Sequence, residues 1–428
     1  MRDLRRTIRR HVGPLFAAWA LLSVVGARSM AQDSSGAEAI LIDDELRGRS
    51  VRLAGIDGAS ILIVDESGRM MRANADSALA LIALQGPVDI TQGIGATLPP
   101  AYEPPELADQ LARAAASAEA GFIETATGER LPGQLAATGG GADVLSWEHP
   151  SFGRIDLALD QVMRVVMPGM RAAASMALTG EPEHDELVLA NGDVLTGFLV
   201  TLGPRTSIET DAGVVEIDAE RVAATVLSNP VQPRLGLVVW LDDGTVTSAS
   251  QIDAVRDGDV RITREGGVSA EYRPLSLRAI AFEASRLVPL STLEPVEQVT
   301  LGERPTTTPV RIRPHPDDFL LGDVALLGAE DVELPSPMRV VYALPADAKR
   351  FAGTAALDPN SAPWGDCEFV VAVDGQELLR RRLHEADAFA SFNIDVAGGR
   401  RLEVRVEPGA FGPIRDRVFI RRGLLLVD

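Results

Sequence analysis

The chain has 428 residues, of which 46% are hydrophobic and 24% charged, so it has room for about two to four domains and wholesale disorder is excluded. Its 41 basic and 61 acidic residues give a formal net charge of −20, which argues against binding nucleic acid by bulk attraction. One cysteine, Cys367, excludes an intrachain disulfide, a cysteine-based zinc site and an iron–sulfur cluster.

Residues 1–31 predict an export signal. Arginines between Met1 and Pro14 precede an apolar run from Leu15 to Ala27, and small residues lead to Ala31, where we place cleavage. A buried helix and an uncleaved anchor are the alternatives, although the run is short for a bilayer span of about 20 residues. The segment holds six Arg and one Asp, so its removal would take the net charge near −25. We therefore expect a secreted, periplasmic or cell-surface protein with no transmembrane segment in the mature chain.

The stretch from Ile40 to Glu283 alternates between apolar and polar residues, which predicts short β-strands. Three blocks within it align: FIETATGERLPGQLAAT from Phe122, LVLANGDVLTGFLVTL from Leu187 and LVVWLDDGTVTSASQI from Leu237. We place these repeats at 121–170, 184–230 and 235–284, with a diverged copy at 36–90. A unit of about 45 residues has a small core, so the repeats should pack against each other.

Glycines indicate how each block folds. Asn191-Gly192 and Asp243-Gly244 are signals for tight hairpin turns, and Gly133 and Gly197 lie inside strand patterns, where glycine marks a bend. Five short, bent strands would close into a small barrel, and LANGDVLTGFLVTL resembles the SH3-like or Sm-like barrel. Sm proteins bind RNA, but an exported, acidic chain without an aromatic and basic platform predicts no nucleic-acid partner.

Residues 91–120 predict a linker between the first two repeats. Pro99, Pro100, Pro104 and Pro105 favour an extended lead-in, and the Ala- and Leu-rich sequence from Glu106 to Glu119 favours one short helix.

Residues 286–428 predict a separate domain. Phe369, Val371 and Val373 alternate before the turn signal Asp374-Gly375, and several such strands over about 140 residues suggest a β-sandwich or jelly roll. The chain as a whole is therefore expected to be mainly β, with tandem small SH3-like barrels, one linker helix and a C-terminal jelly-roll β-sandwich.

The C-terminal third resembles the NPCBM family, the carbohydrate-binding module found beside family 98 glycoside hydrolases. The resemblance rests on LSTLEPV from Leu290, VYALPADAKRFAGTAALD from Val341, FVVAVDGQEL from Phe369 and IDVAGGRRLEVRVE from Ile394. It implies sugar binding on a jelly-roll fold. This chain departs from the family pattern before Tyr342, where GAEDVELPSPMRVVYAL lacks the usual histidine, and near Asp416, where the usual His and Trp are absent.

A sugar site needs an aromatic face for C–H groups and polar side chains for hydroxyls. The segment DPNSAPWGD offers Trp364 together with Asp358, Asn360 and Asp366, which we take as the candidate contact residues. The alternative is that Trp364 plugs the rim of the sandwich.

One motif resembles an enzyme site. Arg313-Pro-His-Pro-Asp-Asp318 is similar to the metal motif of PIG-L/LmbE-like zinc deacetylases, but no parallel α/β pattern accompanies it. We therefore predict no catalytic residue, no metal and no cofactor. The leading hypothesis is a non-catalytic protein that binds a glycan or a cell-envelope polysaccharide. A structural or protein-interaction protein with a degenerate sugar site is the alternative, and a metal-dependent hydrolase is third.

Overall fold

The structure is a computed structural model that describes residues 38–57, 60–65, 67–74, 78–83, 120–138, 143–170, 183–255, 259–273, 276–302, 309–315, 324–359, 364–410, 412 and 416–428. The expected signal at 1–31 and the expected linker helix from Glu106 to Glu119 lie outside these residues. Within the described part, no helix is both long enough and apolar enough to cross a membrane.

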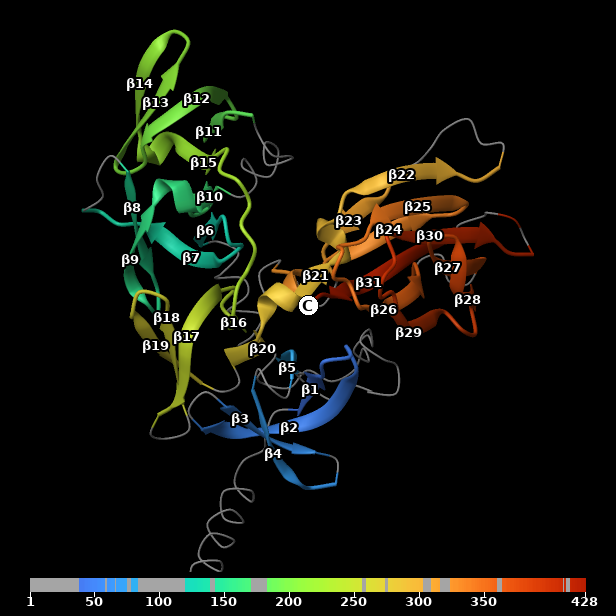
Figure 1. The fold of residues 1–428 in the computed structure, drawn as a ribbon. Coiled ribbons are helices and arrows are strands. Elements are labelled where there is room, and N and C mark those ends of the chain that lie inside the picture. The colour runs from blue at the N-terminus through green and yellow to red at the C-terminus, as the bar shows by residue number, and fades with distance from the viewer. Residues whose placement is uncertain are drawn as a thin grey trace, which may run out of the picture.

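The predicted mainly β fold is confirmed, because strands dominate the described residues and the helical segments among them are single 3-10 turns (Figure 1). The first twenty strands form four repeats of five. Repeat 1 has β1 (Glu38–Ile42), β2 (Gly48–Asp57), β3 (Ser60–Asp65), β4 (Met70–Ala73) and β5 (Ala80–Ala83). Repeat 2 has β6 (Gly121–Thr125), β7 (Arg130–Leu135), β8 (Val144–His149), β9 (Gly153–Ala158) and β10 (Val162–Val166).

Repeats 3 and 4 have the same number of strands. Repeat 3 has β11 (Asp185–Leu189), β12 (Val194–Thr201), β13 (Arg205–Thr210), β14 (Gly213–Asp218) and β15 (Val222–Val226). Repeat 4 has β16 (Val238–Leu241), β17 (Val246–Ala254), β18 (Val260–Arg264), β19 (Ser269–Tyr272) and β20 (Leu277–Ala281). In every repeat the strands pair in the order fifth, first, second, third, fourth, which is the strand order of an SH3-like barrel.

The glycines have the roles that the sequence predicts. Gly192 and Gly244 adopt φ angles of +89° and +83° at the hairpin turns between first and second strands, so those turn predictions are confirmed. A Cβ atom on Gly133 or Gly197 would lie 2.2 or 2.1 Å from a carbonyl oxygen of the next strand. Only glycine allows the second strand to bend this close to the third.

The repeats join in pairs through their fifth strands. β10 pairs with β15, where Val165 faces Thr225, and β5 pairs with β20, where Leu81 faces Ile280. Both pairings are antiparallel and align equivalent positions of the two repeats. This pairing removes the open edges of the fifth strands and gives repeats 1 and 4, and repeats 2 and 3, continuous sheets.

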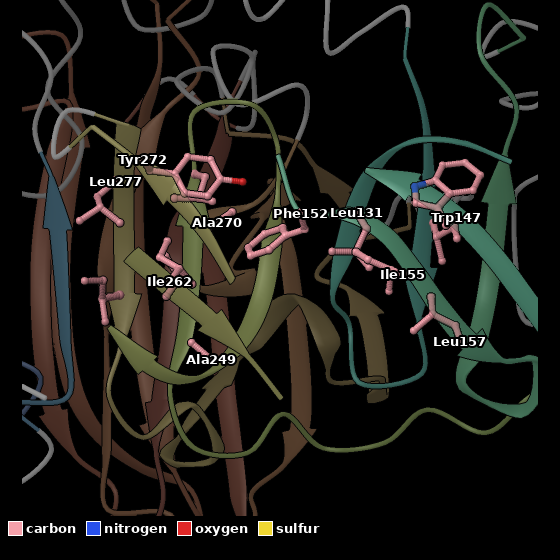
Figure 2. Packing of buried hydrophobic residues seen from close by; sticks show 14 of the residues in the cluster. Leu131, Trp147, Phe152, Ile155, Leu157, Ala249, Ile262, Ala270, Tyr272 and Leu277 are labelled. Carbon is pink, nitrogen blue, oxygen red and sulfur yellow. The ribbon is translucent and has the colours of Figure 1, made fainter. Parts of the chain in front are cut away.

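Repeats 2 and 4 meet side by side (Figure 2). Phe152 of repeat 2 lies between the two groups of core residues, and its ring centroid is 5.9 Å from that of Tyr272 in repeat 4. His149 Nε2 is 3.0 Å from the Thr245 hydroxyl, and Arg264 pairs with Glu129 at 3.2 Å. These polar groups find partners across the boundary. The apolar residues of the two repeats belong to one continuous core.

The C-terminal domain is a two-sheet sandwich. One sheet has the order β23-β24-β31-β26-β29, with β21 also paired to β31: β21 (Leu287–Pro289), β23 (Arg311–Arg313), β24 (Asp331–Pro335), β31 (Arg417–Leu426), β26 (Arg350–Leu357) and β29 (Phe389–Asp395). The other has β22 (Pro295–Thr300), β25 (Met338–Ala343), β30 (Arg401–Pro408), β27 (Asp366–Val373) and β28 (Gln376–His384). From β24 to β31 the eight strands have the order of a jelly roll, so that prediction is confirmed.

One end of this sandwich packs on the barrels (Figure 1). Leu424 and Leu426 of β31 share an apolar cluster with repeat 1 and with Trp240 of repeat 4. The Trp240 indole N–H donates to the Ala325 carbonyl at 3.1 Å, and Asn393 donates to the Glu45 carbonyl at 2.7 Å. The opposite end of the sandwich therefore points away from the barrel repeats.

Candidate functional site

The outward end of the jelly roll is defined by strand register. Strands β24, β26, β28 and β30 end there, and β25, β27, β29 and β31 begin there, as shown by the pairs Pro335 with Arg417 and Asp366 with His384. Leu426, which packs toward the barrels, lies at the other end of β31. Side chains from both sheets can therefore meet a ligand at this outward end without interference from the barrels.

Trp364 lies at this end, just before β27, with 69% of its surface exposed. The alternative in which Trp364 plugs the rim of the sandwich does not match this exposure. An indole has a large flat apolar face and one N–H donor, so an exposed tryptophan beside the start of a strand can contact the C–H face of a ligand.

Asp366 fixes the start of β27, two residues after Trp364. Its carboxylate is buried and accepts hydrogen bonds from Arg382 at 2.6 and 3.0 Å and from the Ala410 N–H at 2.9 Å. The bond from Arg382 is the main reason that the pKa of Asp366 lies below its usual value. The Asp366 N–H donates to Asp416 at 2.9 Å, so Asp416 holds a turn together. The Asp366 carboxylate therefore serves hydrogen bonds within the protein and is not available to a ligand.

Asp358, just after β26 at the other end of the same loop, has a similar role. It is 7% exposed, and its carboxylate is 3.5 Å from Arg417, which also pairs with Glu333 at 3.2 Å. Asn360, the remaining candidate, lies outside the described residues. Of the candidate residues that the structure describes, Trp364 alone offers its side chain directly to solvent.

Two arginines complete the polar surface of this end. The side chains of Arg382 and Arg417 are 57% and 50% exposed. Arg382 donates through Nε and Nη2 to Asp366, and Arg417 pairs through Nε with Glu333 and through Nη1 with Asp358. A guanidinium held in this way keeps further N–H donors for hydroxyl oxygens of a ligand. The sequence analysis did not identify either arginine, because each is held at this end by an aspartate that is distant in sequence. The one signal was the arginine-rich run before His384.

The other reactive side chains that the sequence analysis named, His315 and Cys367, are buried. His315 is 2% exposed and its Nδ1 is 3.3 Å from Arg422, and burial lowers the pKa of His315 to about 2. Asp317 and Asp318 of the same motif lie outside the described residues. The residues that the structure describes contain no group of three or more His, Cys, Asp or Glu side chains able to hold a metal. Cys367 is buried, and burial raises the pKa of its thiol to about 12, which disfavours the reactive thiolate.

A cleft of about 670 Å³ lies elsewhere, where repeat 2 and repeat 4 meet the start of the sandwich domain. Among its charged groups, Glu124 is 3.1 Å from Arg164 and 3.6 Å from Arg130, all within repeat 2, and Arg234 donates to the Gly128 backbone carbonyl at 2.8 Å. Trp364 is not part of this cleft. We interpret the cleft as a seam between domains, where the Arg234 bond to Gly128 links the segment before repeat 4 to repeat 2.

The C-terminal domain is thus a jelly-roll module whose outward end carries an exposed aromatic side chain on a rigid polar base. Residues 332–419 of this module match the family model of the NPCBM/NEW2 domain, which confirms the resemblance found in the sequence. No curated protein matches the chain.

Several solved structures are similar to part of the chain. A CBM51 module from Clostridium perfringens GH95, in complex with methyl-galactose, is 16% identical over 32% of this chain and 99% of its own, with a TM-score of 0.26. The CBM51-2 and INT domains of Clostridium perfringens ZmpB, in complex with GlcNAc, are 13% identical over 50% of this chain and 44% of their own, with a TM-score of 0.27. The tandem CBM51 modules of Streptococcus pneumoniae Sp3GH98 are 12% identical over 57% of this chain and 88% of their own, with a TM-score of 0.27. At these TM-scores the likeness does not assign a ligand to this chain.

Proposed function

We propose that this protein is an exported, non-catalytic carbohydrate-binding protein, and that it binds glycan at the outward end of its NPCBM/NEW2 domain. The observation that carries the proposal is the exposure of Trp364 at that end of the domain that matches the family model.

The geometry supports different roles for the aromatic and the charged residues of this end. Trp364 supplies the apolar face that packs on the C–H side of a pyranose ring, and Arg382 and Arg417 supply donors for ring hydroxyls. Asp366 and Asp358 hold the two arginines and do not touch the sugar. Because these partners are buried, the platform is largely formed before a ligand arrives, which lowers the entropy lost on binding.

The proposed location is the cell surface, the periplasm or the surrounding medium. It rests on the basic, apolar and small-residue pattern of residues 1–31 and on the strongly acidic remainder. A glycan or cell-envelope polysaccharide is the expected partner at that location.

The test uses the exported chain with all its repeats. Wild type, Trp364→Ala and the matched control Phe198→Ser, which alters an equally exposed aromatic residue on repeat 3, are applied to a glycan array, and hits are titrated by calorimetry. We expect wild type and Phe198→Ser to bind alike, and Trp364→Ala to bind at least ten-fold more weakly. A folded wild-type protein that binds no glycan would instead support a protein-interaction role with a degenerate sugar site.

A further inference from the structure

The cleft between repeat 2, repeat 4 and the start of the sandwich domain is large enough for a small molecule. Its volume of about 670 Å³ lies within the range of about 300–1,000 Å³ that is typical of ligand pockets, which often occur where domains meet. Its walls are mainly apolar and include Val231, Trp240, Val288 and Leu327. A ligand with an apolar body would therefore lose its contact with water there, which favours binding.

The charged residues on the walls indicate which head group fits. The described residues that line the cleft include three arginines and two carboxylates: Arg130, Arg164, Arg234, Glu124 and Glu330. The walls therefore carry one positive charge in excess, although the formal net charge of the chain is −20. Arg164 and Arg130 lie 3.1 and 3.6 Å from Glu124, so that carboxylate serves both.

Arg234 forms no ion pair with the described residues. Its Nε and Nη2 donate to the backbone carbonyls of Thr127 and Gly128 at 3.3 and 2.8 Å, and its Nη1 donates no hydrogen bond to a described residue. Burial lowers the pKa of Arg234, and the more distant charges of Glu124 and Glu129 offset this only in part. A cation held in such a place without a counter-charge would gain from pairing with an incoming anion.

Two glycines leave room for the Arg234 guanidinium. A Cβ atom on Gly128 would lie 2.6 Å from Arg234 Nε, and one on Gly328 would lie 2.8 Å from its Nη1. On a third side, Arg234 Cζ is 5.7 Å from the ring centroid of Trp240. The guanidinium is thus fixed beside the apolar wall before a ligand arrives, which lowers the entropy lost on binding.

Glu330 is the remaining charged residue of the cleft. Burial, together with the charge of Glu124, raises the pKa of Glu330, which favours its neutral form and weakens its repulsion of an anion. A ligand with a cationic head that pairs with Glu330 is the competing occupant. The excess of arginines on the walls favours the anion.

We propose that this cleft binds a small molecule with a carboxylate head and an apolar body. The carboxylate accepts hydrogen bonds from Arg234 Nη1, and the apolar body packs on Val231, Trp240 and Val288. Trp364 does not line the cleft, so this site is separate from the proposed glycan site.

The probes are octanoate and octylammonium, which have apolar chains of similar length and opposite charges. Each is titrated into the wild-type chain and followed by calorimetry. We expect saturable binding of octanoate that weakens at high salt, and an affinity about ten-fold lower for octylammonium. No saturable binding of octanoate would overturn the proposal. Tighter binding of octylammonium would also overturn it, because Glu330 would then be the group that selects the ligand.

Variants locate the site on the protein. Arg234→Met removes the charge, and we expect it to weaken octanoate binding about ten-fold. Val231→Asp adds a negative charge to the wall at a side chain that is 66% exposed, so it should fold normally and bind octanoate about five-fold more weakly.

Two controls separate this site from the rest of the surface. Val214→Asp makes the same change at a side chain on repeat 3 that is 61% exposed, and it should bind octanoate like wild type. Trp364→Ala should also bind octanoate like wild type, whatever its effect on glycan binding. Circular dichroism establishes which variants fold. An unchanged affinity of folded Val231→Asp for octanoate, or an equal loss for Val214→Asp, would contradict the proposed site.

Discussion

The two ends of the jelly roll expose opposite kinds of surface. At the end that faces the barrels, Leu424 and Leu426 are almost wholly buried against repeats 1 and 4, so apolar residues there stabilise the packing of the domains. At the outward end, Trp364 is the most exposed large apolar side chain among the described residues of the domain, and the aspartates beside it pair with arginines. The same kind of residue therefore contributes to folding at one end and is free for binding at the other.

The largest effect is expected from a change at the barrel-facing end. Leu426→Ala removes a side chain that is 1% exposed from the cluster between the domains, so we expect the free energy of unfolding to fall by about 2–5 kcal/mol. Urea unfolding followed by circular dichroism measures this change. Trp364→Ala is the matched control at the outward end and should stay within about 0.5 kcal/mol of wild type. Equal losses for the two variants would contradict the contrast between the ends.

Acid should weaken both parts of the molecule through one buried histidine each. Burial lowers the pKa of His149 in repeat 2 to about 3 and that of His315 in the sandwich to about 2, while both are near 6.5 in the unfolded chain. The unfolded state then binds more protons below pH 6.5. Stability should be fully present above that pH and fall by about 1.4 kcal/mol per pH unit for each histidine as the pH drops toward 3.

This pH dependence can be assigned by mutation. Urea unfolding of wild type, His149→Gln and His315→Gln is compared at pH 7 and pH 5. We expect each variant to be less stable at pH 7 but to show a shallower decline toward pH 5 than wild type. Variants with the same slope as wild type would show that these histidines do not cause the decline.

The smallest stability effect is expected at the base of the glycan site. Asp366→Asn keeps the shape of the side chain but removes the charge that holds Arg382, so we expect a loss of about 1 kcal/mol, since Arg382 is more than half exposed. The same contact in wild type should stabilise the fold above the unfolded pKa of Asp366 and be lost as the pH falls through its lowered folded value. We also expect weaker glycan binding, because Arg382 is no longer oriented. Full glycan affinity in this variant would remove Arg382 from the proposed site.

Local signals predicted much of this fold, because turns and strand alternation depend on neighbours in sequence. Gly192 and Gly244 marked real hairpin turns, and Gly133 marked a real bend. The pairing of β10 with β15 was not predicted, since any exposed fifth strand could in principle pair with any other. Long-range pairing leaves no local pattern.

The candidate site was only partly predictable for the same reason. The composition of the loop pointed to Trp364, and the structure places that side chain in solvent. The burial of Asp358 and Asp366 depends on Arg417 and Arg382, which come from distant strands. Which carboxylates are free and which are paired follows from the three-dimensional arrangement, so the sequence could name the residues but not divide their roles.

The central claim is that the outward end of the jelly roll binds glycan through Trp364. Its most direct test is calorimetric titration of the wild-type chain and of Trp364→Ala with the strongest ligand from the glycan array. We predict saturable binding by wild type and an affinity at least ten-fold lower for the variant, with unchanged unfolding for both. Equal affinity of the two folded proteins would contradict the claim.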